Sequence, residues 1–461
     1  MKKNSDWKKT RKRKIVLWWV LSLAAAASIA AVVFTAFRYG IIRLPERNEG
    51  LFAGRKTVRL WYSDKALDEF LSGAELYFNE NNRDLRLDIS YVENAAFLEQ
   101  VNRASIEADE DLPDLFITGN DQLEMAYLSG LAVPVSGDLH FEDPPFFPEA
   151  AVNAVTCDDK IVGWPMYFDT AAFVYDPALL GEGDAVPATV TGLIGFSNLY
   201  NAPAGVTDVF KWDVNDIFYN YGFIGSAIEA GGAGGDDPQM LRIYDRDVLK
   251  CLQTYQQLSS YFSIDASEVD YETVVNDFLH GKYVFSLATT DILKRFETAE
   301  LLQDEGLIGD FGSAPLPDVT DTLRAKGMSV TYALVLNGYS AEQEAASAVA
   351  KYLVYDRGAM LYEQSGKLPC ARPAALTDPR MDGFYAAYEK SEPIVKMREL
   401  GNFWMLTENM LQKVWSGEDA EECLYELYEQ CMSQLGRDAS GTARITDPEP
   451  VDIRSELTGG D

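Results

Sequence analysis

The chain has 461 residues, of which 47 % are hydrophobic and 24 % charged, and its formal net charge is −32 at pH 7. This length exceeds one small domain, and the hydrophobic share is sufficient for a sizeable core. The first 14 residues hold eight Lys and Arg beside one Asp, so the remaining chain carries −39. A body this acidic repels phosphate backbones, which excludes nucleic acid as a partner.

Motifs for catalysis and for metal or phosphate binding are absent from the sequence. There is no GxSxG, HExxH or GxxxxGK[ST], and the glycine-rich run 231–235 lacks the Lys-Ser/Thr pair that cradles phosphate. Two His and five scattered Cys without a CxxC argue against a metal site and define no disulfide framework. With 72 acidic residues, chance carboxylate pairs are expected, so no glycosidase pair stands out. We therefore predict no enzyme, no cofactor and no bound metal.

The N-terminus predicts the compartment. A basic segment, 1–14, precedes an apolar run at 15–37, whose 23 residues are long enough to span a bilayer. Because positive charge stays cytoplasmic, we expect a single-pass anchor with the body on the extracellular side. A cleavable signal peptide is the alternative, with a small-residue cleavage site within 25–31. The apolar run continues beyond that site, which favours the anchor, and no Cys follows it as a lipoprotein would require.

The first part of the body alternates strands with helices. Strands are expected at 58–62, 85–92 and 112–117, followed by amphipathic helices, which predicts a parallel α/β sheet. Ligands bind beyond the carboxyl ends of such strands. The candidate residues there are Tyr62, Ser63 and Asp64 after the first strand, and Asn120 and Asp121 after the third.

The rest of the chain continues the α/β pattern. Expected strands are 161–167, 171–175, 283–288 and 330–336, and expected helices are 250–262, 341–353, 358–365, 402–414 and 420–434. Residues 436–461 are polar and lack apolar periodicity, which predicts a disordered tail.

Six segments in order resemble the extracellular solute-binding proteins of ABC importers, especially the carbohydrate branch that includes maltose-binding proteins. These segments are VRLWYSD, PDLFITGNDQLEMAYLSGLAVPV, DDKIVGWPMYFDTAAFVYDPALL, NDFLHGKYVFSLAT, EQSGKLPCARPAA and NFWMLTENMLQKVWSGEDAEECL. The resemblance covers residues 56–435. It departs from the maltose type at Thr118, where some relatives place a stacking Trp, and in the glycines of 231–235.

The resemblance implies the type II periplasmic-binding-protein fold, in which two α/β lobes of discontinuous sequence are joined by hinge strands. Ligand bridges the lobes and favours the shut state, which the permease recognises. The expected organisation is a basic cytoplasmic segment 1–14, a transmembrane anchor 15–37, a linker 38–55, one lobe from 56–167 and 313–372, the other from 168–312 and 373–435, and a tail 436–461.

A sugar site requires aromatic rings for stacking and planar polar groups for hydroxyls. Asp121 is the first candidate, with helix capping as its alternative role, and Asp64 has the same two roles open. Asp169 lies between two apolar strands, where a charge is expected to face a cleft. The remaining candidates are aromatic or acidic: Trp164, Tyr167, Tyr221, Asp291, Tyr332 and Trp404.

These observations predict the substrate-binding subunit of an ABC transporter, which binds a sugar or oligosaccharide between its lobes and delivers it to permease subunits. The alternatives are a solute-sensing ectodomain of a signalling system, a binding protein for a polyamine or an anion, and, least favoured, a glycoside hydrolase.

Overall fold

The computed structural model describes residues 55–93, 96–109, 111–135 and 146–446. The predicted cytoplasmic segment 1–14, the predicted anchor 15–37, nearly all of the linker and the tail from 447 onward lie outside these residues. Within the part of the chain that is described, no helix combines the length and apolarity needed to cross a membrane.

A seven-stranded mixed sheet forms the core of what we call the large-sheet lobe. Its strand order is β14-β6-β13-β3-β1-β2, and β15 pairs with β13. The strands are β1 (Lys56–Tyr62), β2 (Leu85–Tyr91), β3 (Leu115–Gly119), β6 (Trp164–Thr170), β13 (Met328–Leu336), β14 (Leu368–Pro369) and β15 (Glu392–Pro393). Strands β1, β2 and β3 are parallel, as predicted, whereas β13 runs antiparallel to both β3 and β6.

Helices flank this sheet: α3 (Asp68–Asn81), α4 (Phe97–Ile106), α5 (Leu123–Leu128), α6 (Glu149–Ala154), α12 (Gln343–Lys351) and α13 (Leu361–Ser365). The third strand begins at Leu115 and not at 112 as predicted. Pro113 has no N–H to give to a ladder. The Asp114 carboxylate accepts the Arg59 amide at 2.8 Å in place of a strand bond.

A four-stranded sheet, with order β12-β7-β11-β8, forms the core of the small-sheet lobe. Its strands are β7 (Ala172–Tyr175), β8 (Asp208–Phe210), β11 (Tyr283–Ala288) and β12 (Gly312–Ala314), and its main helices are α7 (Val190–Leu199), α8 (Ile217–Asn220), α9 (Arg246–Phe262), α10 (Tyr271–Leu279), α11 (Asp291–Leu302), α15 (Phe403–Trp415) and α16 (Ala420–Gln434). Stacked aromatic rings fill its core, with Phe173 5.0 Å from Phe285 and Phe210 4.5 Å from Trp212 between ring centroids.

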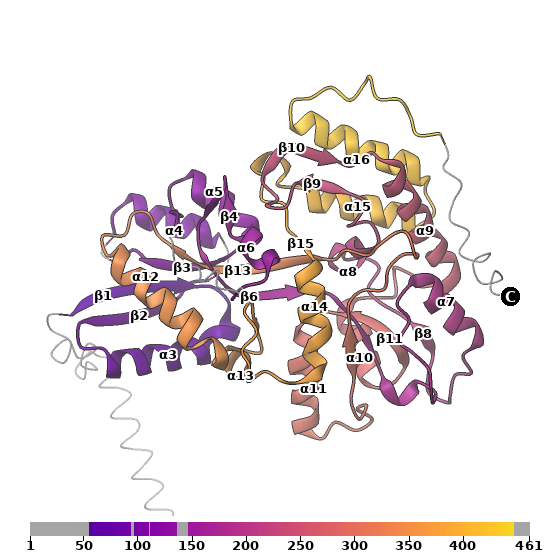
Figure 1. The fold of residues 1–461 in the computed structure, drawn as a ribbon, viewed down its shortest axis with the longest axis horizontal. Helices are drawn as coiled ribbons and strands as arrows, with labels where there is room; N and C mark the ends of the chain where they lie inside the picture. Colours follow the sequence, from indigo (N-terminus) through magenta and orange to yellow (C-terminus); the bar gives the residue numbers. More distant parts are fainter. Residues whose placement is uncertain (1–54, 94–95, 110, 136–145, 447–461) are drawn as a thin grey trace, which may run out of the picture. The chain divides into compact units, whose positions relative to one another are not determined.

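The chain passes from one sheet to the other within a single residue. Strand β6 ends at Thr170 in the large sheet and β7 begins at Ala172 in the small sheet. The intervening Ala171 is 1 % exposed, so the crossing is buried. The chain crosses again between β12 and β13. Figure 1 shows both sheets, with β6 directed toward the small-sheet lobe.

Helix α14 (Asp382–Lys390) packs on strands of both sheets. Its Tyr388 ring stacks on Phe168 of β6 with centroids 3.9 Å apart. On the other sheet, Gly383 packs directly on β12, where an added Cβ would lie 2.3 Å from the Ala314 nitrogen. The glycine is required because the helix backbone approaches the strand this closely.

The five cysteines are buried and free of disulfides, as expected for small hydrophobic side chains. Residues 436–446, which the sequence assigns to a disordered tail, pack against α16 instead. Arg444 forms ion pairs with Glu421 at 2.8 Å and Glu422 at 2.7 Å, and its guanidinium lies 4.1 Å from the Tyr425 ring centroid. These pairs hold the segment on the acidic face of the helix.

Phe173→Ala should lower the free energy of unfolding by about 3–5 kcal/mol, because a buried ring and its stacking partner are lost. Urea denaturation followed by Trp fluorescence measures this change. Leu199→Ala, at a side chain that is 88 % exposed, serves as the control and should leave stability nearly unchanged. Equal effects of the two substitutions would contradict the assigned core.

Candidate functional site

A cavity of about 360 Å³ lies beyond the carboxyl ends of β1 and β3. In the sheet, β2 lies on one side of β1 and β3 on the other. The chain connections from β1 and β2 therefore run in opposite directions along the sheet, so the cavity lies at a topological switch point. Such a point is where open α/β sheets bind ligands. Residues from both strand ends and from β6 and β13 line the cavity: Ser63, Asp64, Lys65, Phe97, Ile117, Thr118, Gly119, Asp121, Gln122, Tyr167 and Tyr332. All of them belong to the large-sheet lobe.

Two tyrosines form an aromatic platform at one wall of the cavity. Tyr167 of β6 and Tyr332 of β13 are direct partners in the antiparallel ladder. Side chains at such positions lie on the same face of the sheet. Their rings stack with centroids 4.4 Å apart and an interplanar angle of 8°. Tyr167 is buried, at 1 % exposed, so the partly buried Tyr332 is the more accessible ring of the pair.

Asp64 has both of the roles that the sequence leaves open. It caps the short turn Lys65–Leu67 by accepting the Ala66 amide at 3.0 Å, and it lines the cavity. Its Oδ2 also forms an ion pair with Lys367 Nζ at 2.9 Å and accepts the Tyr167 hydroxyl at 3.3 Å. The negative charge of the Asp64 carboxylate is therefore balanced by the ammonium group of Lys367.

Asp121 differs from Asp64 because no Lys or Arg in the described part of the chain forms an ion pair with it. Desolvation raises the pKa of this carboxyl, and the amides of Asp121 and Gln122 act in the opposite direction. The carboxylate folds back over Gly119, where an added Cβ would lie 2.4 Å from Oδ1. Asp121 thus presents to the cavity a carboxylate that has no Lys or Arg partner in the described part of the chain.

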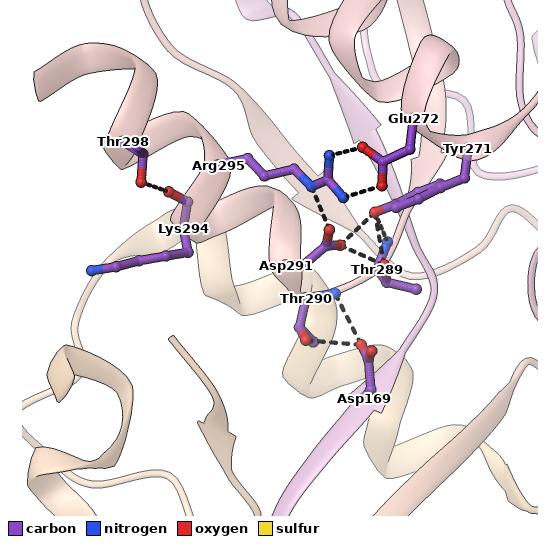
Figure 2. Close-up of polar contacts among 9 residues, drawn as sticks. All are labelled: Asp169, Tyr271, Glu272, Thr289, Thr290, Asp291, Lys294, Arg295 and Thr298. Atoms are coloured by element: carbon purple, nitrogen blue, oxygen red, sulfur yellow. Dashed lines mark hydrogen bonds and ion pairs between the residues drawn. The ribbon is translucent and has the colours of Figure 1, made fainter. Parts of the chain in front are cut away.

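Asp169 lies two residues after Tyr167 on β6, so both side chains are on the same face of the strand. Its Oδ1 accepts the Thr290 amide at 3.0 Å and the Thr290 hydroxyl at 2.8 Å, where α11 begins in the small-sheet lobe. Figure 2 shows this contact between β6 and the start of α11. Asp169 therefore connects the two lobes and is not part of the cavity wall.

The residues around Thr290 form a polar network, drawn in Figure 2. Asp291 accepts the Tyr271 hydroxyl, the Thr289 hydroxyl and Arg295 Nε, each at 2.5 Å. Arg295 in turn pairs with Glu272 through two bonds of 2.5 and 2.6 Å. Burial raises the pKa of Asp169 to about 6, with a further contribution from the charge of Asp291, while the bonds from Thr290 act in the opposite direction.

Three candidates from the sequence have structural roles in the core and do not line the cavity. Tyr62 is 6 % exposed and donates its hydroxyl to Asp68 at 2.7 Å. Asn120 is fully buried, accepts the Thr331 amide at 2.9 Å and donates to the Ile394 carbonyl at 3.4 Å. Trp164 is 1 % exposed within β6.

The structure therefore divides the predicted residues into separate groups. Ser63, Asp64, Asp121, Tyr167 and Tyr332 meet at the cavity. Asp169 and Asp291 lie together at the start of α11. Tyr221 and Trp404 pack edge to face in the small-sheet lobe, with centroids 5.1 Å apart, and Tyr221 is 1 % exposed.

Sequence reasoning missed Lys367 and Thr290. Lys367 precedes the short strand β14 and neutralises Asp64 from far along the chain, which no local pattern indicates. Thr290 lies just beyond the carboxyl end of β11. Ligands bind beyond the carboxyl ends of strands, so the same reasoning that selected Asp64 and Asp121 would have identified Thr290.

A groove of about 380 Å³ between α15 and α16 is comparable in size with the cavity. The Lys413–Glu426 ion pair, at 2.6 Å, joins the two helices there. It lies within one lobe and away from the strand ends, so the cavity between β1 and β3 is the better candidate.

Comparisons with solved structures show the fold. A cyclo/maltodextrin-binding protein complexed with maltotetraose is 20 % identical, with a TM-score of 0.70, over 83 % of this chain and 97 % of its own. An extracellular solute-binding protein from Staphylococcus aureus in complex with maltose is 16 % identical, with a TM-score of 0.70, over 83 % and 98 %. A Thermus thermophilus maltotriose-binding protein bound with maltotriose is 20 % identical, with a TM-score of 0.63, over 82 % and 100 %. The α/β architecture is thus the type II periplasmic-binding-protein fold.

The family follows from the sequence itself. The model of the bacterial extracellular solute-binding proteins matches residues 61–360. The chain belongs to this family, which confirms the resemblance drawn from the six segments. A search of curated proteins gives no significant match. The family is one of extracellular solute-binding proteins.

Asp169→Asn should change the pH dependence of stability. Because the pKa of Asp169 is about 6 in the folded protein against 3.8 for an unperturbed carboxyl, the native state holds this proton more tightly than the unfolded chain. The stability that it contributes is fully present below about pH 4 and is lost as the pH rises through 6. The difference in free energy of unfolding between the variant and the wild type should therefore grow in the variant's favour across this range.

Urea denaturation at a series of pH values from 4 to 7 measures this difference. Asp321→Asn, at an exposed aspartate, is the matched control and should show no such trend. A difference that stays constant with pH in Asp169→Asn would show that this carboxyl titrates normally.

Proposed function

We propose that this chain is the extracellular substrate-binding subunit of an ABC importer and that it binds a maltose-type sugar or oligosaccharide. The observation that carries the proposal is the cavity at the end of β1 and β3, where a stacked Tyr167–Tyr332 pair lies beside the unmatched carboxylate of Asp121. The family match and the sugars named for the similar solved structures support the same assignment.

The chemistry of the cavity suits a sugar. One face of a pyranose ring is apolar and packs on an aromatic ring, which Tyr332 offers. The hydroxyl groups donate hydrogen bonds, which the Asp121 carboxylate accepts more strongly than a neutral group would. A volume of about 360 Å³ is within the range of small-molecule sites.

Ligand binding draws the lobes together in this account. The cavity is lined by one lobe alone, whereas the polar network at the start of α11 belongs to the other. A sugar held by Asp121 and Tyr332 gains additional contacts when Thr290 and its neighbours at the start of α11 approach it. Because those contacts exist only in the closed state, the ligand favours closure by its differential affinity.

The apolar run 15–37 anchors the chain as a single membrane-spanning helix, with the body outside the cell and next to the permease subunits that receive the ligand. The length of this run and the basic residues before it support the anchor.

Alanine at Asp121 or at Tyr332 should weaken the binding of maltose or maltotriose at least about tenfold, because a charged acceptor or the stacking ring is lost. Isothermal titration calorimetry measures the dissociation constant. Tyr339→Ala, at a tyrosine that is 46 % exposed and outside the cavity, is the matched control and should bind as the wild type does.

A thermal-shift screen should include polyamines beside the sugars, because the unmatched Asp121 also suits a cation. A ligand at 100 times its dissociation constant stabilises the folded state by about 2.7 kcal/mol. Stabilisation by polyamines and not by sugars would contradict the sugar assignment, as would wild-type sugar affinity in both cavity variants.

A further inference from the structure

Lys367 is held beside the cavity by a tight turn at the end of α13. The helix ends at Gly366, whose φ is +73° and whose amide donates to the Tyr362 carbonyl at 2.7 Å. A side chain is disfavoured at this position, because the backbone is left-handed and an added Cβ would lie 3.2 Å from Lys294 Cβ. The turn ends the helix just before β14, so Lys367 is the residue that leads into the large sheet.

Strand β14 brings Lys367 to β6, because the two strands are antiparallel with Pro369 opposite Tyr167. Continuing this register places Lys367 opposite Asp169. The Lys367 ammonium group lies 5.6 Å from the Tyr167 ring centroid and 2.9 Å from Asp64 Oδ2. Burial raises the pKa of Asp169, and the charge of Lys367 acts in the opposite direction. One ammonium group is therefore close both to the cavity wall and to the carboxylate that contacts the other lobe.

The charges around the cavity balance only when Lys367 is included. Among the residues that the structure describes, the charged members of the cavity wall are Asp64, Lys65 and Asp121, which together carry −1. Lys367, which pairs with Asp64 without lining the cavity itself, brings the total to zero. Asp169 is directed toward α11 and is not part of the wall. In a chain that carries −39 beyond residue 14, a cavity without net charge favours an uncharged ligand.

We propose that Lys367 is a specificity-determining residue, which keeps the cavity selective for an uncharged sugar against cationic solutes. With the ammonium group in place, the charge of Asp64 is already balanced, so a cation that enters the cavity gains little from this carboxylate. The Asp64 and Lys367 side chains are each 31 % exposed, and partial shielding from water strengthens the attraction between charges. Loss of the ammonium group would therefore leave a negative charge that attracts cations. The identity of the sugar rests on the proposed function, whereas the exclusion of cations does not depend on it.

Lys367→Met, which keeps the aliphatic stem and removes the charge, tests this selectivity in the full-length protein. Isothermal titration calorimetry with maltotriose and with spermidine, a trivalent cation, gives the ratio of the two dissociation constants. The ratio should change by at least about tenfold in favour of spermidine, because an unbalanced carboxylate attracts a cation and not a neutral sugar. Lys367→Arg, which retains a positive charge, should keep the wild-type ratio. Lys367→Gln provides the same comparison should the methionine variant fail to fold.

Two further variants separate the charge of the cavity from other effects of the substitution. Lys367→Met combined with Asp64→Asn restores the balance and should return the spermidine affinity to its wild-type value. Asparagine can still accept the Ala66 amide, so the turn after β1 is retained. Lys294→Met is the matched control: it removes a nearby lysine that pairs with Glu297, and it should leave the ratio unchanged.

A smaller change of the ratio in Lys367→Met would overturn the proposal. An equal change in Lys294→Met, or tighter spermidine binding that persists in the double variant, would overturn it as well. If the wild type binds no maltotriose, the proposed function fails. The spermidine affinities then decide the role of Lys367 alone: binding that is at least about tenfold tighter in Lys367→Met and reversed in the double variant supports it, and any other result overturns it.

Discussion

The passage of one continuous strand run from the large sheet into the small sheet is the constraint on which the rest of the structure depends. Strand β6 and strand β7 are separated only by Ala171, so the direction of one strand fixes the position of the other. Tyr167 and Asp169, two residues apart on β6, face the same way, and one lines the cavity while the other bonds to the start of α11. A rotation about this crossing therefore moves the start of α11, which Asp169 contacts, relative to the cavity that Tyr167 lines.

The carboxylates of Asp64, Asp121 and Asp169 differ in the partners that surround them. Asp64 is paired with Lys367, Asp169 is bonded to Thr290, and Asp121 has no cationic partner among the described residues. A charge that is already matched contributes little to a new ligand, whereas an unmatched one gains from any hydroxyl that donates to it. In the proposed function, the polar binding energy is therefore concentrated at the loop that carries Asp121, which Asn120 joins to Ile394 through a hydrogen bond.

Local pattern was enough to predict the strands around the cavity and the loops that follow them. The alternation of strands and helices over residues 56–128 placed Asp64 and Asp121 at the correct ends of β1 and β3. Local pattern could not predict the role of a side chain whose hydrogen-bond partner lies far away in the sequence. Asn120 carries the same polar groups as a ligand-binding residue, but its amide is used by Thr331 and Ile394, 211 and 274 residues away. Tyr62 and Trp164 have the aromatic character of a sugar site, and the tight packing of the sheet buries them.

The most direct test of the account is a crystal structure of the extracellular body with maltotriose bound. The account predicts that the sugar packs on Tyr332, donates a hydroxyl to Asp121 on one side and contacts residues at the start of α11 on the other. It also predicts that the lobes have rotated toward each other about Ala171. A sugar bound outside the cavity, or bound within it while the lobes keep their present arrangement, would contradict the claim that ligand joins the two halves.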